Sequence, residues 1–258
     1  MKIKLFLILI VVSVLLLGCS LNPTEKEEKI YEDEPGSRYL QTWDLWEPLN
    51  SYNSGQFEKA NWTNGGMFNC GWLPEKATFN NGKLTLKLDN TYSHGKSYSS
   101  GEYRTKNTFS YGTFEVNMKA VKANGVVTSF FLYTGSPWDE IDVEILGKDT
   151  RKVQFNYYVN GVGSHEAVID LGFDAAYGFH KYAIEYGNGY INWYVDGVWK
   201  YGVNNRGFNA PYGAAMPSHP MQIMVNLWPG IGVDSWLNHF YYNGPLYAEY
   251  DYISYKKR

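Results

Sequence analysis

The segment 140–146 carries carboxylates at positions 140, 142 and 144. Its acids are Glu140, Asp142 and Glu144, and the residues between them are Ile141, Val143 and Ile145. Side chains alternate across a β-strand, so this segment would have one acidic face and one apolar face, and the apolar face would belong to the core. Three acids on one face repel each other, and partial burial raises at least one pKa. A costly arrangement of this kind is typical of catalytic sites.

An acidic strand face exposed to solvent is the alternative interpretation, although Trp138 and the aromatic residues near it favour a cleft. Other segments place a polar residue two positions from an aromatic or charged one. These pairs are Asn226 with Trp228, Asn156 with Tyr158, and Glu102 with Arg104. Each pair alone is typical of ordinary sheet surface, but together they could line one concave face. Acids, amides and aromatic rings suit a carbohydrate, which presents hydroxyl groups at the ring edge and C–H groups on the ring faces.

Period-two alternation of apolar residues predicts the strands that would carry these side chains. The predicted strands are 83–88, 112–118, 126–133, 140–146, 152–158, 181–186, 190–195, 222–227 and 249–255. Gly187-Asn188-Gly189 and Asp196-Gly197 lie between such strands and are typical of hairpin turns. Because no long helical period or internal repeat occurs, we predict an all-β fold of two packed antiparallel sheets.

Composition narrows the class of partner. The chain has 258 residues, of which 44% are hydrophobic and 19% charged, which fits one sizeable globular domain. A net charge of -3 with scattered Lys and Arg offers no basic surface for nucleic acid, so we expect none as a partner. Aromatic residues make up 17% of the chain, and they could fill a β-sandwich core or stack on sugar rings.

The N-terminus has the pattern of an export signal. A lysine-containing start precedes an apolar run from Leu5 to Leu17, which is too short to span a bilayer comfortably, because the bilayer core needs roughly 20 helical residues. Leu16-Leu17-Gly18-Cys19 resembles the lipobox of bacterial lipoproteins, in which Cys19 would carry lipid. We therefore predict an extracytoplasmic protein, anchored in a membrane through Cys19 or secreted. An ordinary signal peptide that contains a cysteine by chance is the alternative.

Cysteine content bears on stability. The sequence has 2 cysteines, so if Cys19 carries lipid only Cys70 remains, and no intramolecular disulfide can form. A bond between Cys19 and Cys70 is the alternative, but the acidic, proline-containing stretch after Cys19 reads as a long flexible tether and gives no reason to expect it.

A family resemblance rests on motifs spread along the chain. They are Trp46-Glu47-Pro48-Leu49, Asn64-Gly65-Gly66-Met67-Phe68-Asn69-Cys70, Glu102-Tyr103-Arg104, Trp138-Asp139-Glu140-Ile141-Asp142-Val143-Glu144, Gln154-Phe155-Asn156-Tyr157-Tyr158, Gly178-Phe179-His180 and Pro245-Leu246-Tyr247-Ala248-Glu249-Tyr250-Asp251. This set resembles the bacterial lichenases of glycoside hydrolase family 16. The expected boundaries are then a lipoprotein signal peptide at 1–18, a flexible tether at 19–38 and the catalytic domain at 39–258.

The resemblance implies a jelly-roll β-sandwich with a concave substrate cleft and retaining endo-hydrolysis of mixed-linkage β-1,3-1,4-glucan. Glu140 would be the nucleophile and Glu144 the general acid/base. Asp142 would hydrogen-bond the nucleophile and keep the proton on Glu144 through like-charge repulsion. The implied cleft residues are Asn64, Phe68, Glu102, Arg104, Tyr133, Trp138, Asn156, Tyr158, Asn226 and Trp228, with Trp138 and Trp228 as the main sugar platforms.

A geometric condition follows from these roles. A retaining pair needs carboxyl groups about 5–5.5 Å apart, whereas residues four apart on a strand have Cα atoms about 13 Å apart. Both side chains must therefore lean inward on a curved strand.

The resemblance implies no cofactor for catalysis but a structural calcium. Its ligands would be the backbone carbonyls of Pro48 and Gly82 and the carboxylate of Asp251, oxygen donors that suit this cation. Alternatively, Asp251 merely ends a strand. We expect a monomer.

Three departures from the family pattern border the cleft. Ser100 stands where the family has the disulfide partner of Cys70, so Cys70 should be a buried free thiol. The loop 134–137 is shorter and the stretch 204–219 longer than in close relatives. Trp62 replaces a tyrosine. These changes leave the exact linkage preference open.

Two rival functions follow. The same scaffold could act on laminarin or xyloglucan, by hydrolysis or transglycosylation, although the uninterrupted acid spacing favours the lichenase and xyloglucan-active branches over laminarinases. A non-catalytic glucan-binding lipoprotein predicts loss of an acid, and none is lost.

Overall fold

Alternation of buried and less buried residues governs the strands of the computed structural model, which describes residues 42–258. In β5 (Lys83–Leu88) and β8 (Gly112–Lys119), every second residue is buried. The expected signal peptide, the lipid on Cys19 and the tether fall outside the described residues, as do the first positions of the expected catalytic domain.

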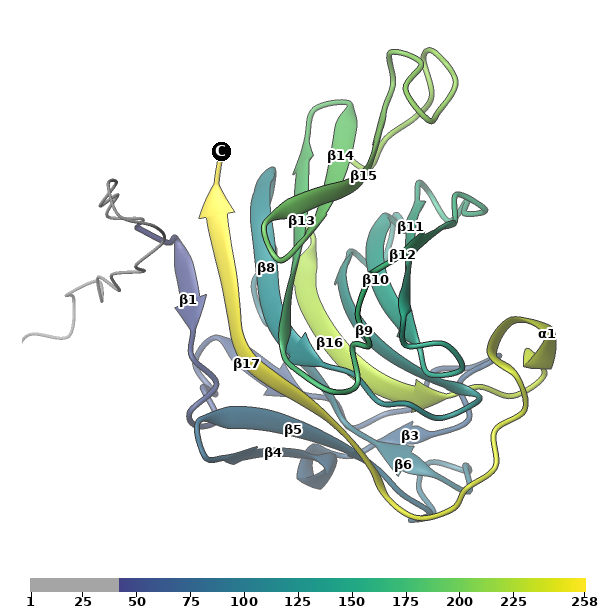
Figure 1. Ribbon diagram of the computed structural model, residues 1–258. Helices are drawn as coiled ribbons and strands as arrows, with labels where there is room; N and C mark the ends of the chain where they lie inside the picture. Colours follow the sequence, from purple (N-terminus) through teal and green to yellow (C-terminus); the bar gives the residue numbers. More distant parts are fainter. Residues whose placement is uncertain (1–41) are drawn as a thin grey trace, which may run out of the picture. The chain divides into compact units, whose positions relative to one another are not determined.

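The larger sheet has eight strands and is the one that does not contain the acidic segment 140–146 (Figure 1). We call it the outer sheet. Its order is β15 (Val198–Asn204), β14 (Tyr190–Val195), β13 (His180–Gly187), β8, β17 (Leu246–Lys257), β5 and β4 (Ala77–Asn80), with β1 (Leu45–Glu47) also paired to β17. All of these pairings are antiparallel.

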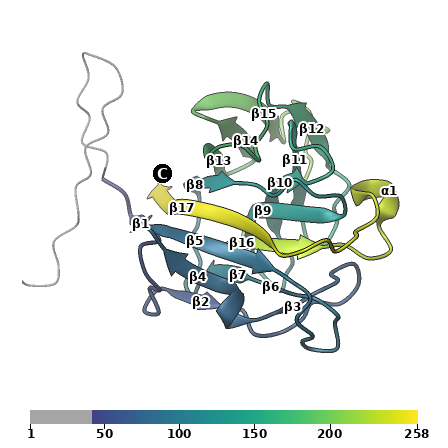
Figure 2. The ribbon, with the colours of Figure 1, turned by 60° about the horizontal axis from the view of Figure 1, so that its bottom comes forward.

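The second sheet, which we call the inner sheet, has seven strands and carries the acidic segment near its middle. Its order is β12 (Ala167–Asp170), β11 (Lys152–Tyr158), β10 (Glu140–Leu146), β9 (Val126–Tyr133), β16 (Gln222–Pro229), β7 (Glu102–Thr105) and β2 (Phe57–Lys59). Its pairings are also antiparallel. Both sheets are curved, and one lies over the other (Figures 1 and 2). The predicted jelly-roll β-sandwich of two packed antiparallel sheets is confirmed.

Most of the long strands agree closely with the prediction. β5, β9, β10, β11 and β14 begin and end at the predicted residues, and the other predicted strands differ only at their ends. The predicted turns are also present: β13 and β14 join through Asn188-Gly189, and β14 and β15 join through Asp196-Gly197. Asp196 and Gly197 have φ of 50° and 75°, the left-handed conformation that a two-residue hairpin turn requires.

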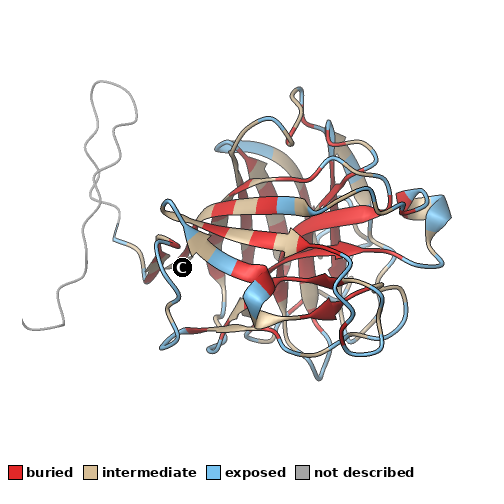
Figure 3. Cartoon of the chain, turned by 90° about the horizontal axis from the view of Figure 1, so that it is seen from below, coloured by how far each residue is buried: buried red, intermediate tan, exposed pale blue. Residues whose placement is uncertain are grey.

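The core fills the space between the two sheets (Figure 3). Two buried polar contacts cross it and fix the strands beneath the acids. The Tyr250 hydroxyl of β17 donates to the backbone carbonyl oxygens of Ser129 at 2.8 Å and Asn226 at 3.2 Å. The Trp193 indole of β14 donates to the backbone carbonyl of Asp142 at 3.1 Å. The outer sheet thus holds the backbone of the inner sheet directly below the carboxylates.

Short elements close one end of the sandwich. β3 (Gly71–Trp72) and β6 (Ser99–Ser100) form a parallel pair, and the 3-10 helix η1 (Pro74–Lys76) follows β3. The short helix α1 (Asp234–Leu237) follows β16. A second apolar cluster lies here, beside the main core. Its buried members are Ala60, Cys70, Trp72, Val127, Leu146, Trp228 and Leu237.

Within residues 42–258, no helix is long and apolar enough to cross a membrane.

Candidate active site

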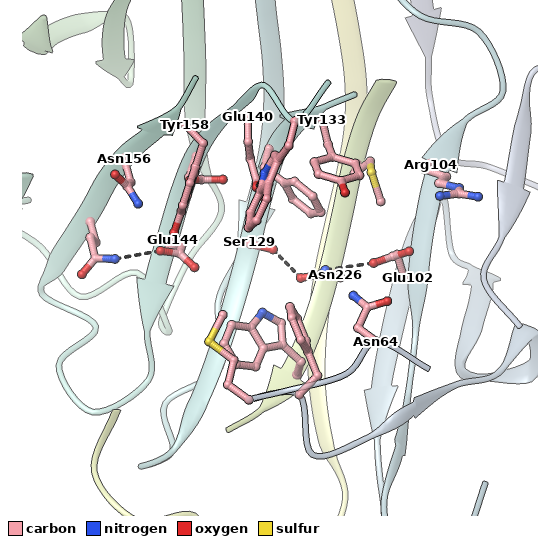
Figure 4. A pocket seen from close by; sticks show the side chains of 18 of the residues that line it. Asn64, Glu102, Arg104, Ser129, Tyr133, Glu140, Glu144, Asn156, Tyr158 and Asn226 are labelled. Atoms are coloured by element: carbon pink, nitrogen blue, oxygen red, sulfur yellow. Dashed lines mark hydrogen bonds between the residues drawn. The ribbon is translucent and has the colours of Figure 1, made fainter. Parts of the chain in front are cut away.

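A cleft of about 620 Å³ opens on the outward face of the seven-stranded sheet. Every cleft and catalytic residue predicted from the sequence lines it. These are Asn64, Phe68, Glu102, Arg104, Tyr133, Trp138, Glu140, Asp142, Glu144, Asn156, Tyr158, Asn226 and Trp228. Figure 4 shows side chains from the central strands and the flanking loops meeting around one space. The members that lie on strands share one face of the sheet, as the two-residue period predicts, whereas Asn64, Phe68 and Trp138 come from the segments between named strands.

β10 has the two faces that its sequence predicts. Ile141, Val143 and Ile145 are fully buried in the core, and the three acids line the cleft. On β11, Glu140 pairs with Tyr158 and Glu144 with Gln154. Glu144 is bonded to its neighbour across the strand, Gln154, whereas the donors of Glu140 lie two residues away along its own chain segment.

Glu140 accepts hydrogen bonds from two donors. The Trp138 indole donates to its Oε2 at 2.6 Å, and the carboxyl group of Asp142 bonds to it from the other side. Burial raises the pKa of Glu140 to about 7, and both hydrogen bonds act against that rise. Donors of this kind favour the ionised carboxylate.

Asp142 lies between the two glutamates and is only 5% exposed. Burial, followed by the charges of Glu140 and Glu144, raises its pKa well above the usual range. The hydrogen bond to Glu140 raises the pKa of Asp142 further while it lowers the pKa of Glu140. The proton of this pair therefore resides on Asp142, which donates to Glu140.

Glu144 accepts a hydrogen bond from Gln154 Nε2 at 2.8 Å. Burial raises its pKa to about 8, the bond from Gln154 opposes this, and the charges of Glu140 and Glu166 add to the rise. The expected like-charge effect on Glu144 thus comes from Glu140 and Glu166, whereas Asp142 is neutral. At neutral pH both Asp142 and Glu144 are therefore held protonated, and the proton of Asp142 is engaged by Glu140.

A polar network lies across β9, β16 and β7. The Ser129 hydroxyl donates to Oδ1 of Asn226, and Asn226 Nδ2 donates to Oε2 of Glu102 at 3.0 Å. Burial raises the pKa of Glu102 to about 7. Nearby, Arg104 bonds to Glu58 at 2.6 Å. Figure 4 shows Asn226 and Glu102 facing the same space as the β10 acids. This arrangement offers hydrogen-bonding groups to the edge of a sugar ring.

Aromatic rings form the walls of the cleft. Trp138 is 41% exposed and stacks on Tyr158, with ring centroids 5.0 Å apart. Trp228 is only 3% exposed and packs against Phe68 at 4.5 Å. Trp62 lies under the guanidinium group of Arg104, with 4.2 Å between Cζ and the ring centroid. Trp138 therefore offers an open ring face, whereas Trp228 presents little surface, which differs from the open platform expected of it.

Several lining residues were missed by the sequence analysis. They are Gly65, Met67, Ser129, Phe131, Gln154, Glu166, Met224 and Trp236. Ser129 and Phe131 share the strand face of Tyr133, and Gln154 shares that of Asn156, so the same two-residue period would have found them. Glu166 and Trp236 lie outside the cleft strands and carry no such signal.

The stretch 204–219 is tied to the acidic segment through Asp139. Asp139 is 1% exposed and accepts hydrogen bonds from the backbone N–H groups of Ser218 at 2.9 Å and Asn160 at 3.1 Å, and from His219 Nδ1 at 2.8 Å. Burial alone would raise the pKa of Asp139, but these bonds lower it. Three loops are thus joined next to Glu140.

The expected calcium ligands Pro48, Gly82 and Asp251 flank a break in strand pairing. β1 pairs with β17 as far as Ile253 and β5 pairs with it as far as Tyr250, so both strands end beside Asp251. Pro48 directly follows β1, and Gly82, with φ of 72°, directly precedes β5. Backbone carbonyls and one carboxylate fit a hard cation. No cluster of three or more His, Cys, Asp or Glu suited to a metal occurs among the described residues.

Cys70 is a buried free thiol, as the substitution at position 100 predicts. Burial raises its pKa. Ser100, at the position of the family's disulfide partner, is fully buried.

Comparison with known proteins identifies the family. Residues 64–250 match the family model described as glycosyl hydrolases family 16. The chain belongs to this family. It is therefore a glycoside hydrolase. A beta-glucanase of Paenibacillus polymyxa is 51% identical over 217 residues, which cover 82% of this chain and 87% of that protein. A beta-glucanase of Acetivibrio thermocellus is 52% identical over 212 residues, which cover 80% of this chain but only 60% of that protein.

Solved structures agree with this assignment. A lichenase derived from a mouse hindgut metagenome superposes on the hydrolase with a TM-score of 0.78 and 44% identity, covering 83% of this chain and 99% of that one. A Bacillus licheniformis beta-glucanase gives a TM-score of 0.76 with 46% identity over 83% and 98% of the two chains. A laminarinase catalytic domain from Thermotoga maritima, at 20% identity and a TM-score of 0.70, shares the fold.

Proposed function

We propose that this family 16 hydrolase cleaves β-1,4 bonds in mixed-linkage β-1,3-1,4-glucan and retains the configuration of the anomeric carbon. The observation that carries the proposal is the unequal bonding of the two glutamates on β10. Glu140 has two donors that favour its ionised form, whereas Glu144 has one neutral donor and two nearby like charges. The beta-glucanase and lichenase names of its relatives support the substrate class.

Each acid then has a distinct role. Glu140 attacks the anomeric carbon and forms a covalent glycosyl-enzyme intermediate, while Glu144 gives its proton to the departing glycosidic oxygen. Glu144 next takes a proton from the water that cleaves the intermediate. Asp142 donates to Glu140 and keeps it oriented. This mechanism requires Glu140 and Glu144 carboxyl groups about 5–5.5 Å apart when substrate is bound.

A different β-glucan is the second candidate, because the differences at the loop 134–137 and Trp62 border the cleft. We would incubate a soluble form lacking residues 1–19 with barley mixed-linkage glucan, laminarin, carboxymethylcellulose and xyloglucan, and measure new reducing ends. Release from mixed-linkage glucan alone is the expected result. Release mainly from laminarin or xyloglucan would keep the acids but change the substrate.

The catalytic roles need a separate test. Glu140→Gln should lower the rate on glucan by at least about 10²-fold, because the nucleophile is lost, while glucan binding persists. Glu249→Gln is the matched control, since Glu249 pairs with Lys83 and Lys119 on the outer sheet. Full activity of Glu140→Gln would contradict the assignment. Binding without any new reducing ends in the unaltered protein would instead favour a glucan-binding role.

We also propose that calcium binds at Pro48, Gly82 and Asp251 and stabilises the junction of β1, β5 and β17. A ligand that binds only the folded state raises the melting temperature. Thermal melting with added calcium and with chelator should therefore differ, and Asp251→Ala should reduce the difference. Equal melting temperatures in both conditions would contradict the site.

Finally, we propose that Cys19 carries a lipid that holds the hydrolase at the cell envelope. Cell fractionation after metabolic labelling with a palmitate analogue should find the label in the membrane fraction. Cys19→Ala should lose the label and release the protein. Equal membrane retention of both proteins would rule out this anchor.

A further inference from the structure

Three side chains form a hydrogen-bonded chain that ends on Glu144. The indole Nε1 of Trp236, in α1, donates to Oε1 of Gln154 at 3.0 Å. Nε2 of Gln154, in β11, donates to Oε2 of Glu144 at 2.8 Å. Gln154 is only 5% exposed, and both ends of its amide are bonded within the protein. The helix α1, which follows β16, is therefore connected to Glu144 of β10 through the buried amide of Gln154.

The chemistry of the donors fixes the orientation of this amide. An indole N–H can only donate a hydrogen bond, so the Gln154 group that faces Trp236 must be the carbonyl oxygen. The NH₂ group is then turned to Glu144 and can only donate to it. Oε2 of Glu144 consequently acts as an acceptor whether the carboxyl group is neutral or ionised. A carbonyl oxygen accepts better than the oxygen of an O–H group, so the proton of neutral Glu144 belongs on Oε1.

We propose that Trp236 and Gln154 are positioning residues that place the Glu144 proton on Oε1, the oxygen available to substrate. Figure 4 shows the dashed hydrogen bond reaching one oxygen of Glu144, while the other oxygen lies on the side away from it. This inference rests on the proposed role of Glu144. During cleavage the Oε1–H bond breaks, its proton passes to the glycosidic oxygen, and that oxygen keeps the electron pair of the broken C–O bond. The same amide then donates to the resulting carboxylate.

Loss of the indole N–H would remove this constraint. With phenylalanine at 236, the Gln154 amide can turn so that its carbonyl oxygen accepts the Glu144 proton. That arrangement favours the protonated acid and directs its proton away from the substrate. The pKa of Glu144 should rise, and proton transfer to the leaving group should slow.

Leaving-group dependence separates this role from simple packing. A glycosidic oxygen of a sugar needs a proton in order to leave, whereas 2,4-dinitrophenolate leaves without one. We would measure kcat/KM, which reports glycosylation, for the full chain on mixed-linkage glucan and on a 2,4-dinitrophenyl glycoside of a glucan oligosaccharide. Trp236→Phe and Gln154→Met should each lose about tenfold on glucan, a part of the 10²–10⁴-fold that general acid catalysis supplies. Both should stay within about twofold on the aryl glycoside.

Two further readouts test whether Trp236 acts through Gln154. In the Gln154→Met background, Trp236→Phe should cost nothing more on glucan, because effects within one network are not additive. The basic limb of the kcat/KM profile on glucan should move to higher pH in Trp236→Phe. Trp199→Phe is the matched control, since its indole makes a similar 3.1 Å bond to Asn192 on the outer sheet. Melting temperatures confirm that each variant is folded.

Equal losses on both substrates, or additive losses in the double variant, would overturn the inference and assign Trp236 to substrate packing. Glu144→Gln distinguishes failure of the inference from failure of the proposed function. If Glu144→Gln keeps full activity on glucan, Glu144 is not the acid. If Glu144→Gln loses glucan activity but Trp236→Phe does not, only the positioning role fails.

Discussion

Replacing Trp138 by phenylalanine removes one donor from Glu140 and leaves an aromatic ring against Tyr158. The indole Nε1 lies 2.6 Å from Oε2 of Glu140. A hydrogen bond to a charged group contributes about 1.5–3 kcal/mol, and because Trp138 is 41% exposed, water competes and the lower end applies. The bond favours the ionised carboxylate, and about 1.4 kcal/mol corresponds to one pKa unit. Trp138→Phe should therefore raise the pKa of Glu140 by about one unit.

The assay is the pH dependence of kcat/KM on the preferred glucan, whose acidic limb reports the group that must be ionised in the free enzyme. This limb should move about one unit to higher pH, while the basic limb changes little. Trp62→Phe is the control, because it also trims a cleft indole but makes no bond to a β10 acid. A shift of KM alone, with both limbs unmoved in Trp138→Phe, would refute the reasoning.

Three stability predictions follow from buried polar contacts. Tyr250→Phe removes the hydroxyl group that donates to two buried carbonyl oxygens, and urea denaturation should show a loss of about 1–3 kcal/mol. Lys76→Met removes one partner of a buried ion pair with Asp89, whose N–O distance is 2.8 Å. Because Lys87 also bonds Asp89, the loss in unfolding free energy should lie near the lower end of about 3–5 kcal/mol. The pKa of Asp139 is lower in the folded state than its unfolded value of about 3.9, so the ionised carboxylate stabilises the fold at pH values above about 3.9. This stabilisation is lost as the pH falls through the folded pKa. The stability difference between the unaltered protein and Asp139→Asn should thus shrink below about pH 4, and an undiminished difference would argue against this linkage.

The cleft floor could be predicted from sequence because it is built from long strands. On β10 a single assumption, that Ile141 and Val143 face the core, places Glu140 and Glu144 on the opposite face. The same period on β11 and β16 brings Asn156 and Asn226 to the cleft. Sheet pairing then brings together residues that are far apart in the chain.

The cleft rim could not be predicted in this way. Trp236 comes from the four-residue helix α1, which is too short to show a periodic pattern. Glu166 lies in the segment before β12, and the backbone bonds to Asp139 depend on where loops 134–139 and 204–219 meet. Short strands such as β1 and β3 were missed for the same reason, because two or three residues cannot show alternation.

Two glutamates on one strand differ in protonation because their neighbours differ. Burial acts on both, and it would hold both protonated if nothing opposed it. Glu140 has donors in Trp138 and Asp142, which lie two residues before and after it along the chain, and these donors favour its charge. That charge in turn helps to keep the proton on Glu144. The proton on Glu144 therefore depends on the ionisation of Glu140, and the pKa values belong to the coupled site rather than to single residues. A donor of Glu140 therefore acts on Glu144 only through the charge of Glu140, whereas Trp236 and Gln154 act directly on the proton that Glu144 retains.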